Sequence, residues 1–124
     1  MNKLFDELLT EIKKLKQENL LIIVEGNNDK ISLEKLGLHN VYSINKRAMY
    51  KIIDDAKEYE EVIILTDLDN EGKKLYKVLS VKLNELGVKV NNKFRHFLFK
   101  HTSVRQVEGL FSYMQRLDIN RYEM

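Results

Sequence analysis

Cysteine and proline are both absent from this chain. Without cysteine there can be neither a disulfide framework nor a thiolate metal site. Without proline, the ends of helices and strands must be marked by glycine and by polar capping residues. The chain also lacks an apolar run of the roughly 20 residues that a membrane helix needs, and its first residues lack the apolar block of a signal peptide. We therefore expect a cytoplasmic protein that has no contact with a membrane.

A large excess of charge of one sign is missing as well. The net charge is only +2, so a broad electrostatic footprint on nucleic acid is not indicated, and the position of any local basic patch matters more than the total. The 124 residues are 44% hydrophobic and 32% charged, which is typical of a globular domain and not of a disordered chain. We expect a single domain over residues 1–124.

Helical and strand-like patterns alternate along the sequence. Apolar residues at helical spacing predict helices over residues 2–18, 27–36, 48–56 and 75–86, and a last helix over about 104–117. Apolar runs, most of them rich in β-branched residues, predict strands over residues 20–24, 41–44, 62–65 and 94–99. The alternation implies an α/β fold with a parallel sheet, whose core spans about residues 20–109. In such sheets, ligands bind at the carboxyl ends of the strands.

Acidic residues follow two of these strands at the edge where ligands bind. Glu25 comes directly after the first strand, and Asp67 and Asp69 follow the third. Taken alone, each Asp would more often be a helix cap. Three carboxylates at one edge would instead repel one another and raise one another's pKa, a conflict that a cation resolves. Because only oxygen ligands are on offer, we expect Mg²⁺ or Mn²⁺ and not Zn²⁺, which points to phosphoryl or nucleotidyl transfer.

Three further residues accompany these acids. Asp29 lies four residues after Glu25 and is either a metal ligand or a helix-start acid that favours the helix dipole. Gly26 is expected to let the backbone turn tightly after Glu25, and Gly72 is expected to let a ligand approach the start of the long helix. Either glycine could also be an ordinary turn residue.

The sequence around these acids resembles the Toprim family, which topoisomerases, bacterial-type primases, OLD-family nucleases and a ribosomal-RNA maturation nuclease share. The first family motif is found here as IIVEGNND over residues 22–29, and the second as VIILTDLDNEG over residues 62–72. The similarity covers roughly residues 20–109. It is closest to small archaeal and bacterial proteins that consist of little but this domain.

The resemblance implies both a fold and a set of roles. The fold is Rossmann-like, with four parallel strands in the order 2-1-3-4 flanked by helices, so that the first and third strands lie side by side. Asp67 and Asp69 would coordinate Mg²⁺, and Glu25 would act as a general acid or base or would poise the metal. Residues 107–110 resemble a Val-Glu segment that follows the fourth strand in these proteins. Glu108 is therefore either an auxiliary acid or a solvated residue at a helix start.

Basic residues at the same edge are candidates for binding phosphate. Lys46 and Arg47 follow the second strand, and Lys100, His101 and Arg105 follow the fourth. Cations there could hold flanking phosphates while the metal holds the reactive one. The two arginines are the better candidates, because a guanidinium binds phosphate through two parallel hydrogen bonds. A lysine-rich solvated surface is the alternative for the lysines.

Two functions from different classes remain. The first is Mg²⁺-dependent phosphodiester chemistry on DNA or RNA, most simply hydrolysis of the nuclease type, because hydrolysis needs neither the tyrosine domain of topoisomerases nor the template-binding region of primases. The second is a non-catalytic module that binds nucleic acid or a nucleotide through the same metal, or a subunit of a larger nucleic-acid machine. A homodimer or a protein partner is compatible with both.

Two other α/β enzymes and switches fit the acids less well. A phosphoacceptor receiver domain needs an acidic pair after its first strand, where this chain has only Glu25. A haloacid-dehalogenase phosphatase needs its Asp-x-Asp motif after the first strand, whereas Asp67 and Asp69 follow the third.

Overall fold

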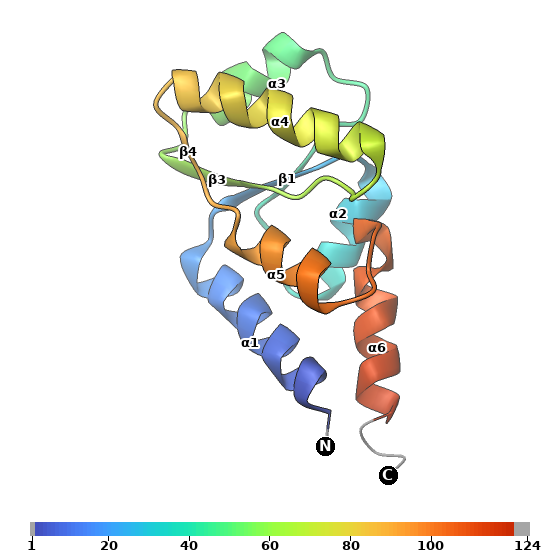
Figure 1. The fold of residues 1–124 in the computed structure, drawn as a ribbon. Coiled ribbons are helices and arrows are strands. Elements are labelled where there is room, and N and C mark those ends of the chain that lie inside the picture. Colours follow the sequence, from blue (N-terminus) through green and yellow to red (C-terminus); the bar gives the residue numbers. More distant parts are fainter. Residues whose placement is uncertain (1, 121–124) are drawn as a thin grey trace.

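A central parallel sheet lies between two layers of helices in the computed structural model, which describes residues 2–120 (Figure 1). The sheet has four strands in the order β2-β1-β3-β4, and every neighbouring pair is parallel. The strands are β1 (Leu21–Val24), β2 (Val41–Ser43), β3 (Glu61–Ile64) and β4 (Lys89–Val90). The predicted α/β class and strand order are therefore confirmed.

The pairing of β1 with β3 decides where the site lies. Ile22 is the Cα partner of Ile63, so the two strands reach the same edge of the sheet after the same number of residues. The pairing continues past the strands, because the Leu65 N–H donates to the Ile23 carbonyl at 2.8 Å. Residues just beyond β1 and β3 are therefore neighbours at the carboxyl edge.

Within residues 2–120, seven helical segments surround the sheet. They are α1 (Lys3–Glu18), α2 (Asn27–Lys35), α3 (Met49–Ala56), α4 (Asn70–Glu85), α5 (Lys93–His101), the 3₁₀ turn η1 (Val107–Gly109) and α6 (Leu110–Asn120). Figure 1 shows α3 and α4 on one face of the sheet, and α1, α2, α5 and α6 on the other. No helix within residues 2–120 is long and apolar enough to cross a membrane.

Both faces of the sheet are buried under helices. Successive side chains of a strand point to opposite faces, so each strand contributes to both cores. Ile22 and Val24 enter the core formed with α1, α2, α5 and α6, whereas Leu21 and Ile23 enter the core formed with α3 and α4. This double burial explains why the strands are continuous apolar runs in the sequence.

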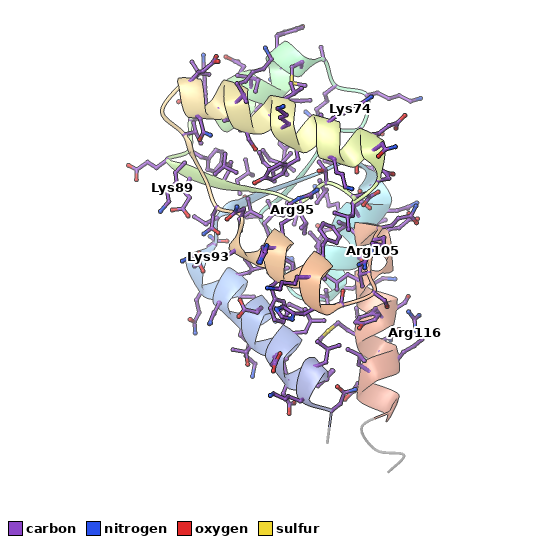
Figure 2. The ribbon with its side chains drawn as sticks, viewed as in Figure 1. Lys74, Lys89, Lys93, Arg95, Arg105 and Arg116 are labelled. Atoms are coloured by element: carbon purple, nitrogen blue, oxygen red, sulfur yellow. The ribbon has the colours of Figure 1, made fainter. Side chains whose placement is uncertain are left out.

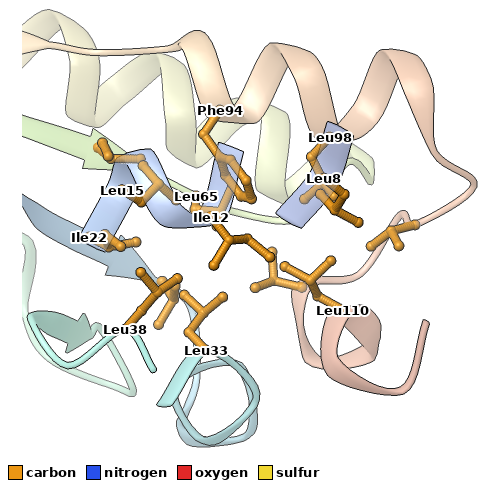
Figure 3. Packing of buried hydrophobic residues seen from close by; sticks show 14 of the residues in the cluster. Leu8, Ile12, Leu15, Ile22, Leu33, Leu38, Leu65, Phe94, Leu98 and Leu110 are labelled. Atoms are coloured by element: carbon orange, nitrogen blue, oxygen red, sulfur yellow. The ribbon is translucent and has the colours of Figure 1, made fainter. Parts of the chain in front are cut away.

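Helix α1 completes the larger of the two cores. Its residues Leu8, Ile12 and Leu15 are buried at helical spacing and pack among the side chains of the sheet, α2 and α5 (Figure 3). The helix begins where the Asn2 side chain accepts the Phe5 N–H at 3.0 Å. It ends at Asn19, which adopts a left-handed conformation with φ of 50°. The N-terminal segment is thus a structural part of the domain.

The prediction of a strand over residues 94–99 is wrong. These residues belong to α5, and the fourth strand is the shorter β4, which precedes it. The aromatic residues of the segment favour a strand by propensity, but Phe94 and Leu98 stand four residues apart and are both buried against the core, which is the spacing of a helix. The last helix also starts later than residue 104, because residues 104–106 form an irregular loop before η1.

The burial of α1 generates a stability prediction. Ile12→Ala removes a side chain that is only 1% exposed, so we expect the free energy of unfolding to fall by about 2–5 kcal/mol. Ile31→Ala on α2 is the matched control, since Ile31 is 48% exposed and its loss should cost less than about 0.5 kcal/mol. Urea denaturation measures both values. Equal losses for the two variants would show that α1 is not packed as described.

Candidate functional site at the carboxyl edge

A side-chain contact joins the ends of β1 and β3. The Glu25 carboxylate accepts the backbone N–H of Asp67 through Oε2 at 2.7 Å. Glu25 also belongs to the next pairing, because its carbonyl accepts the Asn45 N–H at 2.9 Å. The predicted meeting of Glu25 with the segment after the third strand is therefore observed, and it rests on the parallel pairing of β1 with its two neighbours.

Asp67 faces the segment that follows α5. Its Oδ1 accepts the N–H of Val107, the first residue of η1, at 2.8 Å. The next residue, Leu68, donates its N–H to the Arg105 carbonyl at 2.9 Å. Asp67 is thus not a helix cap. It instead holds residues 105–107 against the edge of the sheet.

Asp69 and Asp29 do cap helices. Asp69 is the N-cap of α4, and its Oδ1 accepts the Gly72 N–H at 2.7 Å. Asp29 lies in the first turn of α2 and accepts the Gly26 N–H through Oδ2 at 3.0 Å. Each of these hydrogen bonds uses one carboxylate oxygen. The other oxygen of Asp69 has no hydrogen-bond partner among the described residues, whereas the Asp29 carboxylate also interacts with the backbone of Glu108. Capping therefore orients the Asp69 carboxylate and leaves one of its oxygens available.

Two acids at this edge, Glu25 and Asp29, have a raised pKa. Burial raises the pKa of Glu25 above its ordinary value, the hydrogen bond from Asp67 opposes this, and the negative charges of Asp67, Asp69 and Asp29 raise it further. Burial also raises the pKa of Asp29, to which the charges of Asp67 and Glu108 contribute. The five acids therefore form one region of mutual repulsion, which a bound cation would relieve.

The donor set suits a hard cation with an incomplete protein shell. No group of three or more His, Cys, Asp or Glu side chains within the described residues is arranged to hold a metal ion by itself. Mg²⁺ usually takes only one or two carboxylates and fills its shell with water and substrate phosphate. Asp67 and Asp69 fit this pattern, because each carboxylate accepts a backbone N–H through one oxygen and has a second oxygen for a metal ion. The joint ligation of one metal by Glu25, Asp67 and Asp69 stays a prediction.

Arg95 is the main residue of the site that sequence reasoning missed. It lies on α5 with only 8% of its surface exposed, and its guanidinium donates to the Thr66 carbonyl, to Thr66 Oγ1 at 3.2 Å and to the Asp67 carbonyl at 3.3 Å. Figure 2 shows it between α5 and α4, where the guanidinium lies over the rings of Tyr76 and Phe99 at 4.7 and 4.9 Å. Arg95 therefore supports the backbone from which Asp67 projects.

The charge of Arg95 also bears on the acidic edge. Burial lowers the pKa of its guanidinium, while the charges of Glu25 and Asp67 act in the opposite direction. An arginine remains protonated in proteins, so a buried positive charge lies against the acidic loop, which is formed by residues 66–69. The spacing of four residues between Arg95 and Phe99 could have indicated that both lie on one face of a helix. The prediction of a strand over residues 94–99 excluded that interpretation.

The two motif glycines differ in what they allow. A Cβ on Gly72 would overlap the Asp67 carbonyl oxygen, so only glycine lets the start of α4 approach the β3 loop this closely. The Thr66 hydroxyl donates to the Gly72 carbonyl at 2.7 Å and so also holds the start of α4 against the loop after β3. Gly26 is extended, with φ of −139°, and a Cβ there would meet only Asp29 Oδ2 at 3.9 Å. The backbone after Glu25 therefore has no need of a glycine, which agrees with the alternative that Gly26 is an ordinary turn residue.

The basic candidates fall into two groups. Lys46 and Arg47 are exposed and follow β2 at the carboxyl edge, where the Arg47 guanidinium lies 4.9 Å from the centre of the Tyr42 ring. Arg105 lies in the loop before η1 and donates through Nη1 to the carbonyls of Thr102 and Val104 at 2.9 and 2.8 Å.

Lys100 and His101, like Arg105, do not follow a strand, contrary to the prediction. They are exposed residues in the last turn of α5, and the His101 ring lies 5.1 Å from that of Phe97. Glu108 is exposed within η1, beside Asp29.

Comparisons with known proteins agree with this geometry. Residues 19–92 match the profile of the Toprim domain family, a range that includes Glu25, Asp67 and Asp69 and ends before Arg95. A UPF0292 protein of Methanocaldococcus jannaschii is 41% identical over 119 residues, which cover 90% of this chain and 93% of that protein. A UPF0292 protein of Pyrococcus abyssi is 33% identical and covers 94% of this chain and 89% of its own length. A solved structure of a protein from Aquifex aeolicus superposes with a TM-score of 0.73 at 32% identity, over 83% of this chain and 94% of that one.

The glycine contrast generates a prediction. Gly72→Ala forces the Asp67 carbonyl away from α4, so we expect a loss of about 1–3 kcal/mol of unfolding free energy. Gly26→Ala meets no obstacle and should change stability by less than about 1 kcal/mol. Thermal unfolding of both variants measures the difference. The described approach of α4 to the β3 loop is wrong if Gly72→Ala is as stable as the wild type.

Arg95 generates a second prediction. Arg95→Met leaves the carbonyls of Thr66 and Asp67 without their buried donor, which should destabilise the fold by about 1–3 kcal/mol. Lys93→Met on the same helix is the control, because Lys93 is exposed and its side chain has no hydrogen bond or ion pair with the described residues, while its backbone N–H donates to the Asn91 side chain. Chemical denaturation compares the two. A loss no larger in Arg95→Met than in Lys93→Met would contradict the supporting role of Arg95.

Proposed function

The chain belongs to the Toprim domain family, and from this premise we propose that it carries out Mg²⁺-dependent phosphodiester chemistry on nucleic acid, most simply hydrolysis of the nuclease type. The observation that carries the proposal is the contact of Glu25 with the Asp67 N–H, inside a group of carboxylates whose negative charges help to raise the pKa of Glu25. Such a group has a purpose where a divalent cation and a phosphate are to be held together.

Each acid has a distinct position in the proposed site. Asp67 and Asp69 would hold the cation through the carboxylate oxygens that the N–H groups of Val107 and Gly72 leave unused. When bound, Mg²⁺ supplies Lewis-acid polarisation of a phosphate oxygen. Glu25 holds the Asp67 backbone, and the resemblance to the family assigns to it either proton transfer or the poising of the metal. Asp29 and Glu108 add negative charge at the same edge.

Cations on either side of the acids would hold the flanking phosphates of the substrate. Arg47 and Lys46 lie on the β2 side, and Arg105 lies on the side of η1, with its guanidinium fixed by two carbonyls. His101 is less well placed, because it ends α5 and does not follow a strand. This arrangement separates a central acidic edge from basic flanks, as contact with a charged backbone on both sides of one phosphate requires.

A second function is favoured by one observation. Because the described residues contain no ready group of three metal ligands, the acids could hold a cation only together with a bound phosphate. A non-catalytic module that binds nucleic acid or a nucleotide through Mg²⁺, alone or as a subunit of a larger machine, would need no more than that. Turnover distinguishes the two functions.

Amide substitutions generate the decisive prediction. Glu25→Gln, Asp67→Asn and Asp69→Asn each keep an oxygen that can accept the same backbone N–H, so the fold should persist. Without metal, the loss of one repelling charge should leave the melting temperature unchanged or raise it. In millimolar Mg²⁺ the wild type should gain stability by linkage, roughly 3–6 °C per kcal/mol, and the variants should lose most of that gain together with any hydrolysis.

The measurements are thermal melts with and without Mg²⁺, repeated with a bound oligonucleotide, and cleavage assays on RNA and DNA with Mg²⁺ or Mn²⁺. Glu58→Gln is the control, since Glu58 is an exposed acid just before β3, at the opposite edge of the sheet. If Mg²⁺ stabilises all proteins equally, or none of them even with oligonucleotide, the proposed metal site is wrong. If the Mg²⁺ effect follows the acids but no substrate is cleaved, the binding module is the better description.

A further inference from the structure

An open cavity of about 440 Å³ lies beside Asp69, between the loop that follows β3, the loop that precedes η1, and α6. Besides Asp69, the polar side chains that line it include Arg105, Gln106, Tyr113 and Arg116. We propose that this cavity, here called the strand pocket, binds one nucleotide of an unpaired nucleic-acid strand next to the acidic edge. The proposal rests on the proposed function and specifies its substrate class.

The charges of the strand pocket suit a phosphate. Arg105 and Arg116 come from two separate segments and lie on the same side of the molecule, where both line the cavity (Figure 2). Neither guanidinium forms an ion pair with a carboxylate in the described part of the chain. The bonds from Arg105 Nη1 to two carbonyls fix that guanidinium and leave its other nitrogens free of partners among the described residues. Two guanidinium groups at one cavity favour an anion that accepts several hydrogen bonds.

The flat groups of the strand pocket suit a base. Tyr113 is half-buried in the wall of the cavity, and the Arg116 guanidinium lies 5.9 Å from the centre of its ring. Bases stack on tyrosine rings and on guanidinium planes, but only where their own faces are free, as in unpaired strands. The Gln106 amide adds a hydrogen-bond donor and an acceptor. The volume lies within the range of about 300–1,000 Å³ that is usual for pockets of small ligands, and a nucleotide falls in this class.

The strand pocket is continuous with the acidic edge. Asp69 belongs to its lining and to the acidic loop, and Leu68 between the two acids donates its N–H to the Arg105 carbonyl at 2.9 Å. A nucleotide in the pocket would therefore place the next phosphate of its strand at Asp67 and Asp69. A base pair could not enter, because both of its bases would have to leave their stack. The geometry thus favours unpaired strands or unpaired ends as substrates.

Binding without metal tests the proposal independently of hydrolysis. The probes are fluorescein-labelled 12-nucleotide single strands of DNA and RNA and the corresponding DNA duplex, measured by anisotropy in EDTA between about 50 and 200 mM salt. We expect the wild type to prefer the single strands to the duplex. Arg116→Ala and Tyr113→Leu should each weaken single-strand binding by roughly tenfold, and Tyr113→Phe should restore it, because the ring provides the stacking. Arg116→Ala should also lower the salt slope by about 0.7–1.

Lys89→Ala is the matched control, because Lys89 is exposed on β4 and lies on the far side of the molecule from the strand pocket (Figure 2). It removes the same charge and should leave binding unchanged. The proposal is overturned if the wild type binds no single strand, if it prefers the duplex, or if Arg116→Ala binds like Lys89→Ala. Arg116 is exposed, so this variant remains informative even if Tyr113→Leu fails to fold.

This binding assay, together with the melts and cleavage assays that test the proposed function, separates the two proposals. Single-strand binding that depends on Arg116 and Tyr113, without Mg²⁺-dependent stabilisation or cleavage, supports the strand pocket and contradicts the metal site. Cleavage that depends on the acids but is insensitive to both pocket variants supports the proposed function and contradicts the strand pocket.

Discussion

The Glu25 carboxylate accepts the backbone N–H of Asp67, and the rest of the site depends on this contact. It can form only because β1 and β3 are adjacent and parallel and end at the same edge. The contact brings a half-buried acid beside Asp67 and Asp69, whose charges add to the effect of burial in raising its pKa. A bound cation would offset this repulsion between carboxylates, so the arrangement suits a cation site.

The acidic loop is held from both sides. The buried guanidinium of Arg95 binds the carbonyls of Thr66 and Asp67, while the Asp67 carboxylate binds the N–H of Val107. Both partners lie after residue 92, beyond the segment that matches the Toprim profile. The segment from α5 to η1 therefore orients Thr66 and Asp67, which belong to the family motif, although the segment itself lies outside that motif. Such support is what a site needs if its ligands are to keep one geometry.

Helix capping and metal binding do not exclude each other here. Asp69 caps α4 and Asp29 lies in the first turn of α2, and the bonds from Gly72 and Gly26 each use a single carboxylate oxygen. The cap holds the side chain in one orientation, which lowers the entropy that a ligand would otherwise have to overcome. The alternatives weighed for these residues from sequence alone are therefore compatible, and the structure shows the capping half of each.

The apolar runs by themselves determined the strands β1 to β3 and the acids that follow them, because strands buried on both faces leave a continuous signal in the sequence. The spacing of Leu8, Ile12 and Leu15 likewise determined α1. Only the tertiary structure decided that residues 94–99 are helical, since their aromatic residues fit both periods and packing of Phe94 and Leu98 against the core selects one. The helical conformation of this segment also places Arg95 against Thr66 and Asp67. These contacts join residues that are 29 and 28 positions apart, so no local sequence pattern predicts them.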